Sequence, residues 1–213
     1  MLHEKIAEMQ KQMQANAPAN LLTELGEEIQ KIIASDIASA AKQPGAEAVS
    51  FELPDDNGEI FSLDEALKQG PVVLQFNRGT WCPYCDLQMK ALQEKLSEIK
   101  EAKAELVIIM PQLSDQVKEY KKENGIEFKI LQDQGNEMAA LYGLRFTLPE
   151  KMQELYQKFK IDIPGSNGDD NQTLPIPATY VISPDKKITY AFVDPNWTNR
   201  PEPNEMITAL KAL

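Results

Sequence analysis

The sequence predicts an α/β protein in which a mixed β-sheet lies between layers of helices. Apolar runs of the kind found in buried strands occur at 72–76 and 106–110. A stretch with helical spacing of apolar residues follows each run, an alternation typical of parallel strand pairs. Two later runs, 178–182 and 188–192, are separated by the turn Ser183-Pro184-Asp185, which predicts an antiparallel pair.

Composition limits the functional classes. The chain has 213 residues, 42% of them hydrophobic and 26% charged, as expected of an ordinary globular protein. A formal net charge of −11 argues against binding to nucleic acid or to an anionic membrane surface. No apolar stretch is long enough for a transmembrane helix, and residues 1–6 lack an apolar signal segment. We therefore expect a cytoplasmic protein.

The first 43 residues predict a helical arm. One helix face carries apolar residues at spacings of four, three and four: Leu2, Ile6, Met9 and Met13. Pro18 interrupts the pattern, and Asn20 is the expected N-cap of a second helix that ends at Pro44-Gly45. We interpret the arm as a packing or dimerisation element, which makes a homodimer possible.

The domain that begins at residue 44 predicts alternating strands and helices. Asn57-Gly58 between two apolar runs indicates a β-hairpin. Gly70-Pro71 ends a short helix before the first buried strand. The expected elements, in order, are a helix at 64–69, a strand at 72–76, a loop at 77–81, a helix at 83–101, a strand at 106–110, a helix at 114–124, a strand at 128–131 and a helix at 136–142.

Residues 145–176 read as an insertion in the domain, which extends from 44 to 213. Within the insertion we expect a helix at 148–160, with Pro149 in its first turn. The stretch 164–172 is rich in Gly, Asn and Asp and predicts a mobile loop. A final helix is expected at 203–213.

Scarce residue types restrict the chemistry. His3 is the only histidine, and Cys82 and Cys85 are the only cysteines. A closed zinc site takes four ligands, usually Cys and His, so one chain cannot supply it. Nucleophilic catalysis with a positioned imidazole is disfavoured for the same reason. We expect no metal, flavin or nucleotide cofactor.

The two cysteines form a C-x-x-C motif where a strand leads into a helix. Cys82 stands at the predicted helix start, where free backbone N–H groups lower a thiol pKa from ~8.5 into the range ~3.5–7.5. Cys85, one turn later, can attack a mixed disulfide on Cys82. The pair could also be core cysteines or half of an intermolecular zinc clip. The flanking Trp81 and the enclosed Pro83 favour a redox pair.

A family resemblance covers about residues 44–212. The segment from Phe76 to Cys85 resembles the active-site segment of the thioredoxin superfamily. The wider sequence is similar to the AhpC/TSA family, in its peroxiredoxin-like branch with a C-x-x-C motif. The similar segments are Phe51-Glu52-Leu53-Pro54, Asn57-Gly58, Arg78-Gly79-Thr80-Trp81-Cys82-Pro83-Tyr84-Cys85 and Pro177-Ala178-Thr179-Tyr180-Val181-Ile182. The resemblance implies a thioredoxin-like fold, with the arm as an N-terminal helical extension, and thiol redox chemistry.

The resemblance offers two chemistries. Against the peroxiredoxin pattern, Cys85 falls on the peroxidatic cysteine, Cys82 on the catalytic threonine and Arg78 on the proline. The family's distant arginine would precede the strand at 180–182, where Pro177 stands instead. Against the thioredoxin pattern, Pro177 falls on the cis-proline that faces the C-x-x-C motif, although it could simply shape a loop.

The neighbours of the cysteines each have two interpretations. Trp81 covers the disulfide as a substrate surface or belongs to the core. Arg78 stabilises a thiolate or binds a substrate anion, or it is solvated; Thr80 bonds a sulfur or shapes the loop. Gln75 stands near the position at which thioredoxin-like proteins keep a buried polar group. The dipeptide Pro83-Tyr84 is typical of glutaredoxins, which implies a potential nearer ~−200 to −230 mV than ~−270 mV.

We therefore predict a thiol–disulfide oxidoreductase. Cys82 attacks a substrate disulfide, Cys85 resolves the mixed disulfide, and an external dithiol donor, such as a thioredoxin- or glutathione-type system, restores the dithiol. The alternative is a thiol peroxidase with Cys85 or Cys82 as the peroxidatic cysteine. A further alternative is a redox-sensing module that binds a partner through the arm or the insertion.

Overall fold

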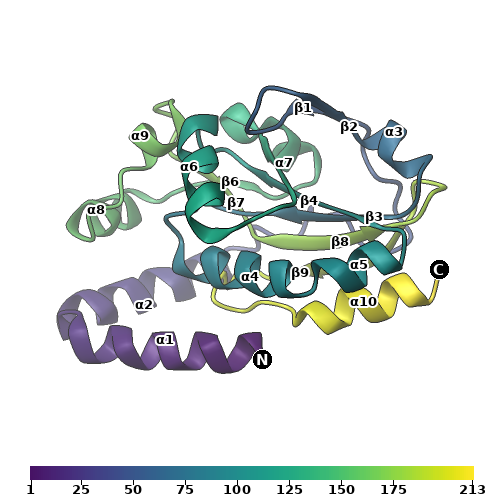
Figure 1. Cartoon of the computed structure of the whole chain (residues 1–213). Helices are drawn as coiled ribbons and strands as arrows, with labels where there is room; N and C mark the ends of the chain where they lie inside the picture. Colours follow the sequence, from purple (N-terminus) through teal and green to yellow (C-terminus); the bar gives the residue numbers. More distant parts are fainter.

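The computed structural model describes all 213 residues around a five-stranded sheet in the order β5-β4-β3-β8-β9 (Figure 1). Strands β3 (Val72–Phe76), β4 (Glu105–Met110) and β5 (Lys129–Gln132) are parallel. Strands β8 (Ala178–Ile182) and β9 (Ile188–Val193) run antiparallel to their neighbours. The predicted mixed sheet is confirmed, and β3 and β8 match their predicted ranges.

Helices and a hairpin cover the two faces of the sheet (Figure 1). On one face lie α4 (Pro83–Glu94), α5 (Leu96–Glu101) and α10 (Pro203–Lys211). On the other lie α3 (Leu63–Leu67), α7 (Glu137–Leu141) and the hairpin of β1 (Glu52–Pro54) and β2 (Ile60–Ser62). Helix α6 (Ser114–Asn124) leads into β5. Successive side chains of β3 point to opposite faces of the sheet, which explains why each face has its own core. Val73 packs into one core, and Val72, Leu74 and Phe76 pack into the other.

The predicted long helix at 83–101 is two helices. Lys95, with φ −109° and ψ 5°, breaks the helical backbone, and its N–H bonds back to Leu92 and Gln93. Leu92 and Leu96, on either side of the break, are both buried in the same core. The bend keeps the two short helices on the face of the sheet.

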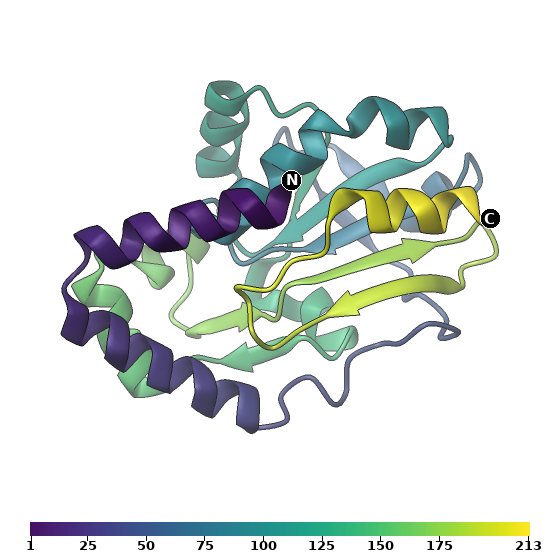
Figure 2. The same cartoon turned by 90° about the horizontal axis from the view of Figure 1, so that it is seen from below.

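The arm consists of α1 (Leu2–Asn16) and α2 (Ala19–Ala34), which meet at an acute angle at one end of the molecule (Figure 2). The N-cap of α2 is Pro18, and the predicted N-cap Asn20 lies within the helix. The second helix ends at Ala34, before the predicted end, and Asp36 adopts φ 57° in the turns that follow. No helix of the protein has the length and hydrophobicity needed to cross a bilayer.

The segment 145–176 contains more regular structure than the sequence predicts. Its ends pair as β6 (Arg145–Thr147) and β7 (Thr173–Pro175), which enclose α8 (Glu150–Lys158). A short helix, α9 (Ile163–Asn167), replaces part of the predicted mobile loop. The Asp162 carboxylate caps it by accepting the Gly165 N–H at 3.0 Å. The prediction of a loop was wrong because one cap and buried Ile163 and Asn167 suffice to order the turn. A 3-10 turn, η1 (Gln134–Asn136), precedes α7.

Candidate active site

The two cysteines lie where β3 leads into α4. Cys82 is the N-cap of α4, with φ −85° and ψ 115°, and Pro83 occupies the first turn, as predicted. Cys85 follows one turn later. Both are free thiols, and their exposed fractions are only 1% and 0%. The site is therefore a buried dithiol at the N-terminus of a helix.

A guanidinium group lies beside each sulfur. Arg78 Nη1 is 3.9 Å from the Sγ of Cys82, and Arg200 Nη2 is 3.3 Å from the Sγ of Cys85. Both arginines are buried, with exposed fractions of 2% and 3%. The third arginine, Arg145, pairs with Glu137 at 2.6 Å, whereas Arg78 and Arg200 have no carboxylate partner. Two buried positive charges thus lie beside the sulfurs without a carboxylate to neutralise them.

Aromatic rings enclose Arg78. Its guanidinium carbon lies 5.2 Å from the ring centroid of Trp81, 5.5 Å from Tyr156 and 4.3 Å from Trp197. Its Nη2 donates to the Tyr156 hydroxyl. Burial lowers the pKa of Arg78, but Tyr156 and Cys82 raise it more, so the net shift is upward. The interpretation of Arg78 as a solvated loop residue was wrong.

Arg200 is a candidate site residue that the sequence analysis did not identify. It follows β9, and it donates from Nε to the Trp197 carbonyl at 3.0 Å and from Nη1 to Gln88 at 2.8 Å. The peroxiredoxin pattern places an arginine before β8, where this chain has Pro177. The structure supplies the positive charge from a different loop. No local motif marks Arg200 as a partner of a cysteine 115 residues away.

The electrostatic environment places the negative charge on Cys85. Burial raises the pKa of Cys82 well above its ordinary value. Burial also acts to raise the pKa of Cys85, but the Cys82 thiol and the arginines outweigh it, and the net pKa falls well below the ordinary value. When the reduced pair holds a single proton, these surroundings favour the proton on Cys82. The sequence predicts a lowered pKa for Cys82, whereas burial and the hydrogen bond with Cys85 raise it here, and the closer guanidinium contacts the other sulfur.

Pro177 does not carry the predicted cis bond. The chain contains no cis peptide bond. Pro177 is buried between β7 and β8, and the neighbouring Ile176 N–H donates to the Leu144 carbonyl at 2.8 Å. Its place in the structure fits the simpler interpretation that it shapes this connection.

The loop before Cys82 is shaped by a close approach of Trp81 to Gly79. A Cβ on Gly79 would lie 2.2 Å from the indole Nε1, and Gly79 has φ 154°. Only glycine leaves room for the ring in this position. The Thr80 N–H donates to Gln112 at 2.6 Å, which fits the loop-shaping interpretation of that residue. The ring of Trp81 packs on Tyr156, with centroids 5.9 Å apart.

Two further residues from the sequence analysis lie near the pair. Gln75 is fully buried in β3, donates to Asn77 at 2.7 Å, and leaves its own Oε1 without a partner. The hydroxyl of Tyr84 accepts a hydrogen bond from Gln10 of α1 at 3.4 Å. No group of three or more His, Cys, Asp or Glu side chains could hold a metal ion. The polar groups that the structure gathers here surround a dithiol.

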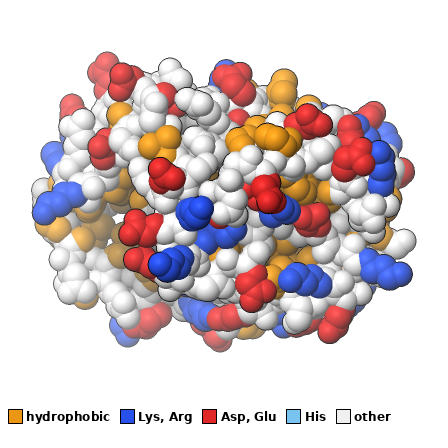
Figure 3. Space-filling model, turned by 45° about the horizontal axis from the view of Figure 1, so that its top comes forward, with side chains coloured by type: hydrophobic (Ala, Val, Ile, Leu, Met, Phe, Trp, Pro, Cys, Tyr) orange, Lys and Arg blue, Asp and Glu red, His pale blue; other side chains and the backbone are white.

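A pocket of about 130 Å³ opens in front of Cys82. Cys82 and Arg78 belong to its lining, and Cys85 does not. The other walls are Met13 of α1, Leu25 of α2, the aromatic residues Trp81, Tyr84, Tyr156 and Trp197, and Pro83, Phe159 and Ile161. In Figure 3, hydrophobic side chains gather around a hollow at the end of the molecule where α2 and α8 lie. Of the two cysteines, Cys82 is therefore the one that faces the pocket.

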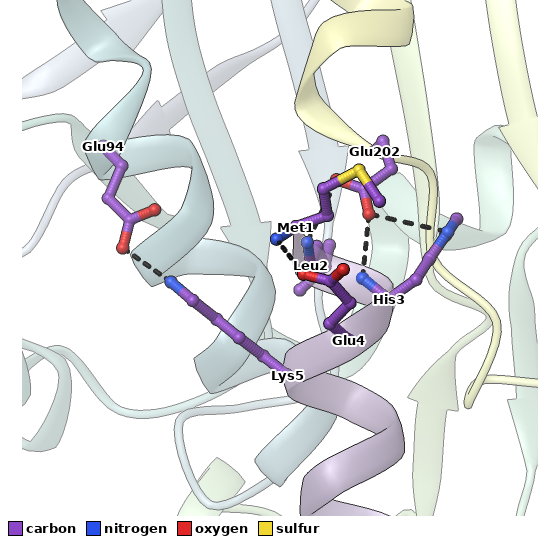
Figure 4. A network of polar contacts seen from close by, with 7 residues as sticks. All are labelled: Met1, Leu2, His3, Glu4, Lys5, Glu94 and Glu202. Atoms are coloured by element: carbon purple, nitrogen blue, oxygen red, sulfur yellow. Dashed lines mark hydrogen bonds and ion pairs between the residues drawn. The ribbon is translucent and has the colours of Figure 1, made fainter.

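The arm also contacts the segment that carries Arg200. The Glu202 carboxylate accepts the backbone N–H groups of Leu2 at 3.1 Å and His3 at 2.8 Å (Figure 4). The His3 ring contacts the Arg200 carbonyl through Nε2 at 2.7 Å. Although burial raises the pKa of Glu202, the N–H groups of the arm and the His3 ring lower it overall. One end of the arm is thus attached within two residues of Arg200.

Comparison with known proteins gives relatives of two kinds. The chain is 34% identical over 104 residues to the thiol-disulfide oxidoreductase ResA of Halalkalibacterium halodurans, covering 47% of this chain and 57% of the relative. It is 32% identical over 100 residues to the chloroplastic peroxiredoxin Q of Oryza sativa subsp. japonica, covering 47% of this chain and 46% of the relative. The chain therefore spans about half the length of the curated relatives it matches.

Solved structures support the fold. The peroxidoxin BcpB of Mycobacterium tuberculosis superposes with a TM-score of 0.63 at 20% identity, covering 80% of this chain and 97% of that protein. This likeness confirms the predicted thioredoxin-like fold. The model of the AhpC/TSA family matches residues 44–191, well over half of the sequence. The chain belongs to the AhpC/TSA family.

Proposed function

We propose that the protein is a thiol–disulfide oxidoreductase that works through a Cys82–Cys85 dithiol/disulfide couple. The division of roles between the two sulfurs carries the proposal. Cys82 lines the pocket, whereas Cys85 lies behind it with Arg200 at 3.3 Å. An accessible sulfur that attacks and a charge-stabilised sulfur that resolves are what a two-step exchange needs.

In the first step the shared proton passes from Cys82 to Cys85. The Cys82 thiolate then attacks a substrate disulfide, which forms a mixed disulfide and releases one substrate thiolate. That thiolate takes the proton from Cys85. The Cys85 thiolate, stabilised by Arg200, attacks the Sγ of Cys82 and releases the second substrate thiolate. The protein loses two electrons to the substrate and becomes the Cys82–Cys85 disulfide.

Reduction of that disulfide returns the protein to its starting state. Small thiols of a glutathione-type system would attack Cys82, the cysteine that lines the pocket, and so reduce the disulfide. The curated relatives named as thiol-disulfide oxidoreductase and peroxiredoxin support an exchange of this kind. We assign the cycle to the cytoplasm, where thiol-reducing systems maintain dithiols.

Trapping the mixed disulfide tests the proposal. Reduced full-length protein is mixed with a disulfide substrate, and the product is identified by intact mass. In Cys85→Ser the mixed disulfide on Cys82 should accumulate, because the resolving sulfur is missing. In Cys82→Ser no adduct should form at a comparable rate. Equal adduct formation in the two variants would overturn the assigned roles.

A second candidate function is thiol peroxidase activity that begins at Cys85, and the contact between Arg200 and Cys85 favours it. The Cys85 thiolate would attack the O–O bond of a peroxide, which gives a sulfenic acid and an alkoxide or hydroxide that takes the proton of Cys82. The Cys82 thiolate would then displace hydroxide from the sulfenic sulfur. Both candidates end in the same disulfide.

Stopped-flow oxidation by hydrogen peroxide separates the two candidates. Fast peroxide consumption that survives Cys82→Ser and is lost in Cys85→Ser would identify a peroxidase. Slow peroxide consumption with rapid exchange at Cys82 would identify the oxidoreductase. The two serine variants serve as controls for each other, since each replaces one sulfur by oxygen, at the N-cap or in the first turn of α4.

A further inference from the structure

We propose that the pocket in front of Cys82 binds small organic disulfides through an apolar group about the size of an aromatic ring. The walls supplied by the arm and by the segment 145–176 would determine this specificity. The inference rests on the proposed exchange at Cys82 and names the class of substrate for it. It excludes the disulfide of a folded protein as the preferred substrate.

The size and polarity of the pocket indicate the group it binds. Nine of its eleven lining residues are hydrophobic, and its volume is about 130 Å³. A buried apolar cavity of ~150 Å³ holds one benzene molecule. The pocket therefore fits one aromatic ring or a short branched alkyl group, placed against Cys82.

The charges near the pocket indicate which kind of disulfide the substrate carries. Arg78 and Arg200 bring two buried positive charges, and the reduced pair brings one negative charge. Arg78 also leaves its Nε without a hydrogen-bond partner. A second negative charge, such as the thiolate that leaves during exchange, would be stabilised next to Arg78. An aryl disulfide combines such a leaving group with an apolar ring.

The cover over Cys82 limits the size of the substrate. Met13 and Leu25 come from the arm, and Phe159 and Ile161 follow α8. Helices α2 and α8 are joined by an ion pair between Lys151 and Glu24 at 3.0 Å. With these segments in place Cys82 is only 1% exposed. A disulfide in a folded protein is too bulky to reach it, whereas a ring-sized group enters the pocket.

Exchange rates of reduced full-length protein with three disulfides test the inference. The probes are dithiodipyridine, oxidised glutathione and insulin, and each rate is divided by the rate of the same probe with dithiothreitol. We expect the normalised rate to be highest for dithiodipyridine. Leu25→Asn should lower that rate about tenfold or more, because an apolar contact in a binding pocket is lost. The rate with oxidised glutathione, which offers no ring-sized apolar group, should fall by a smaller factor.

Leu22→Asn is the matched control, since Leu22 is a half-buried leucine of the same helix that does not line the pocket. It should leave all three rates unchanged. Phe159→Ala gives a second variant in case the polar substitution unfolds the arm, which circular dichroism would reveal. It should also lower the preference for dithiodipyridine.

Two results would overturn the inference while leaving the proposed function intact. One is a normalised rate with insulin or oxidised glutathione that equals the rate with dithiodipyridine. The other is a preference for dithiodipyridine that Leu25→Asn and Phe159→Ala both leave unchanged. Failure of the proposed function looks different, because then no probe would form a disulfide with Cys82 at all.

Discussion

Two regions meet at Cys82, and they are built differently. The cradle, residues 72–94, comprises β3, the loop and α4, and it holds the sulfurs by backbone geometry and by contact with two buried guanidinium groups. The cover, residues 1–34 together with 145–176, holds its place by apolar packing and by half-exposed ion pairs such as Lys151–Glu24. Exposed pairs of that kind contribute only ~0–1 kcal/mol.

The difference assigns separate tasks to the two regions. Charges next to the cradle decide which sulfur carries the thiolate, and the cover decides what reaches Cys82. The arm lies outside the residues matched by the family model, which begins at residue 44. Substitutions near the cradle should therefore change the titration of the thiols, whereas substitutions in the cover should change stability or access.

The largest expected effect comes from Arg200→Met. Because the pKa of Cys85 is lowered below its ordinary value, its thiolate persists at a pH where a free thiol, with a pKa of ~8.5, is protonated. Loss of a charge-assisted contact worth ~1.5–3 kcal/mol should raise the titration midpoint by about one to two pH units. Thiolate absorbance measured against pH would show the shift.

Arg145→Met is the control for that experiment. Arg145 is exposed on β6 and pairs with Glu137, so its loss should leave the thiol titration unchanged. Arg200→Lys should recover part of the shift, since it keeps the charge without the guanidinium geometry. A titration midpoint that stays constant in Arg200→Met would refute the assignment of Arg200 as the residue that stabilises the Cys85 thiolate.

The second-largest expected effect concerns the contact between residues 35–43, which follow α2, and the rest of the domain. Gly143 has φ 70°, and a Cβ there would lie 2.1 Å from the Ala40 carbonyl oxygen. The Lys42 N–H donates to the Tyr142 carbonyl at 3.1 Å in the same place. Gly143→Ala should destabilise the protein by about 2 kcal/mol or more, through backbone strain and the clash together. Denaturant unfolding would measure the loss.

Gly125→Ala separates these two causes. Gly125 also has a positive φ, 63°, but nothing lies within 4 Å of a Cβ built there. It should cost about 1 kcal/mol, from backbone strain alone. Equal losses of stability in Gly143→Ala and Gly125→Ala would show that the backbone at Ala40 moves aside without an energetic penalty. That result would contradict a fixed attachment of residues 35–43.

The cradle could be predicted from the sequence because its signals are local. A run of five residues, four of them apolar, predicts β3, and Cys82-Pro83 marks the start of α4. The charge partner of Cys85 could not be predicted in this way. Arg200 lies far along the chain in a polar loop, and only the packing of α4 against that loop brings the two together.

The cover shows a second limit of predicting structure from local sequence patterns. Periodicity located both helices of the arm, but it could not place them over the pocket or show that α2 ends at Ala34. The short pairing of β6 with β7 was missed, since three-residue strands leave no period to detect. The helix terminus predicts a lowered pKa for Cys82, whereas the tertiary surroundings raise the pKa of Cys82 and lower that of Cys85, which no local pattern indicates.

The smallest expected effect comes from His3→Ala, where cover and cradle come closest. His3 is half-exposed, and its ring contacts the Arg200 carbonyl at 2.7 Å rather than the guanidinium. Its loss should reduce stability by less than about 1 kcal/mol and leave the thiol titration unchanged, because Gln88 and the Trp197 carbonyl still hold the guanidinium. Thermal unfolding and thiolate absorbance measured on one sample would give both values. A shift of the titration midpoint as large as that in Arg200→Met would mean that the arm positions Arg200, and the two regions would then act as one.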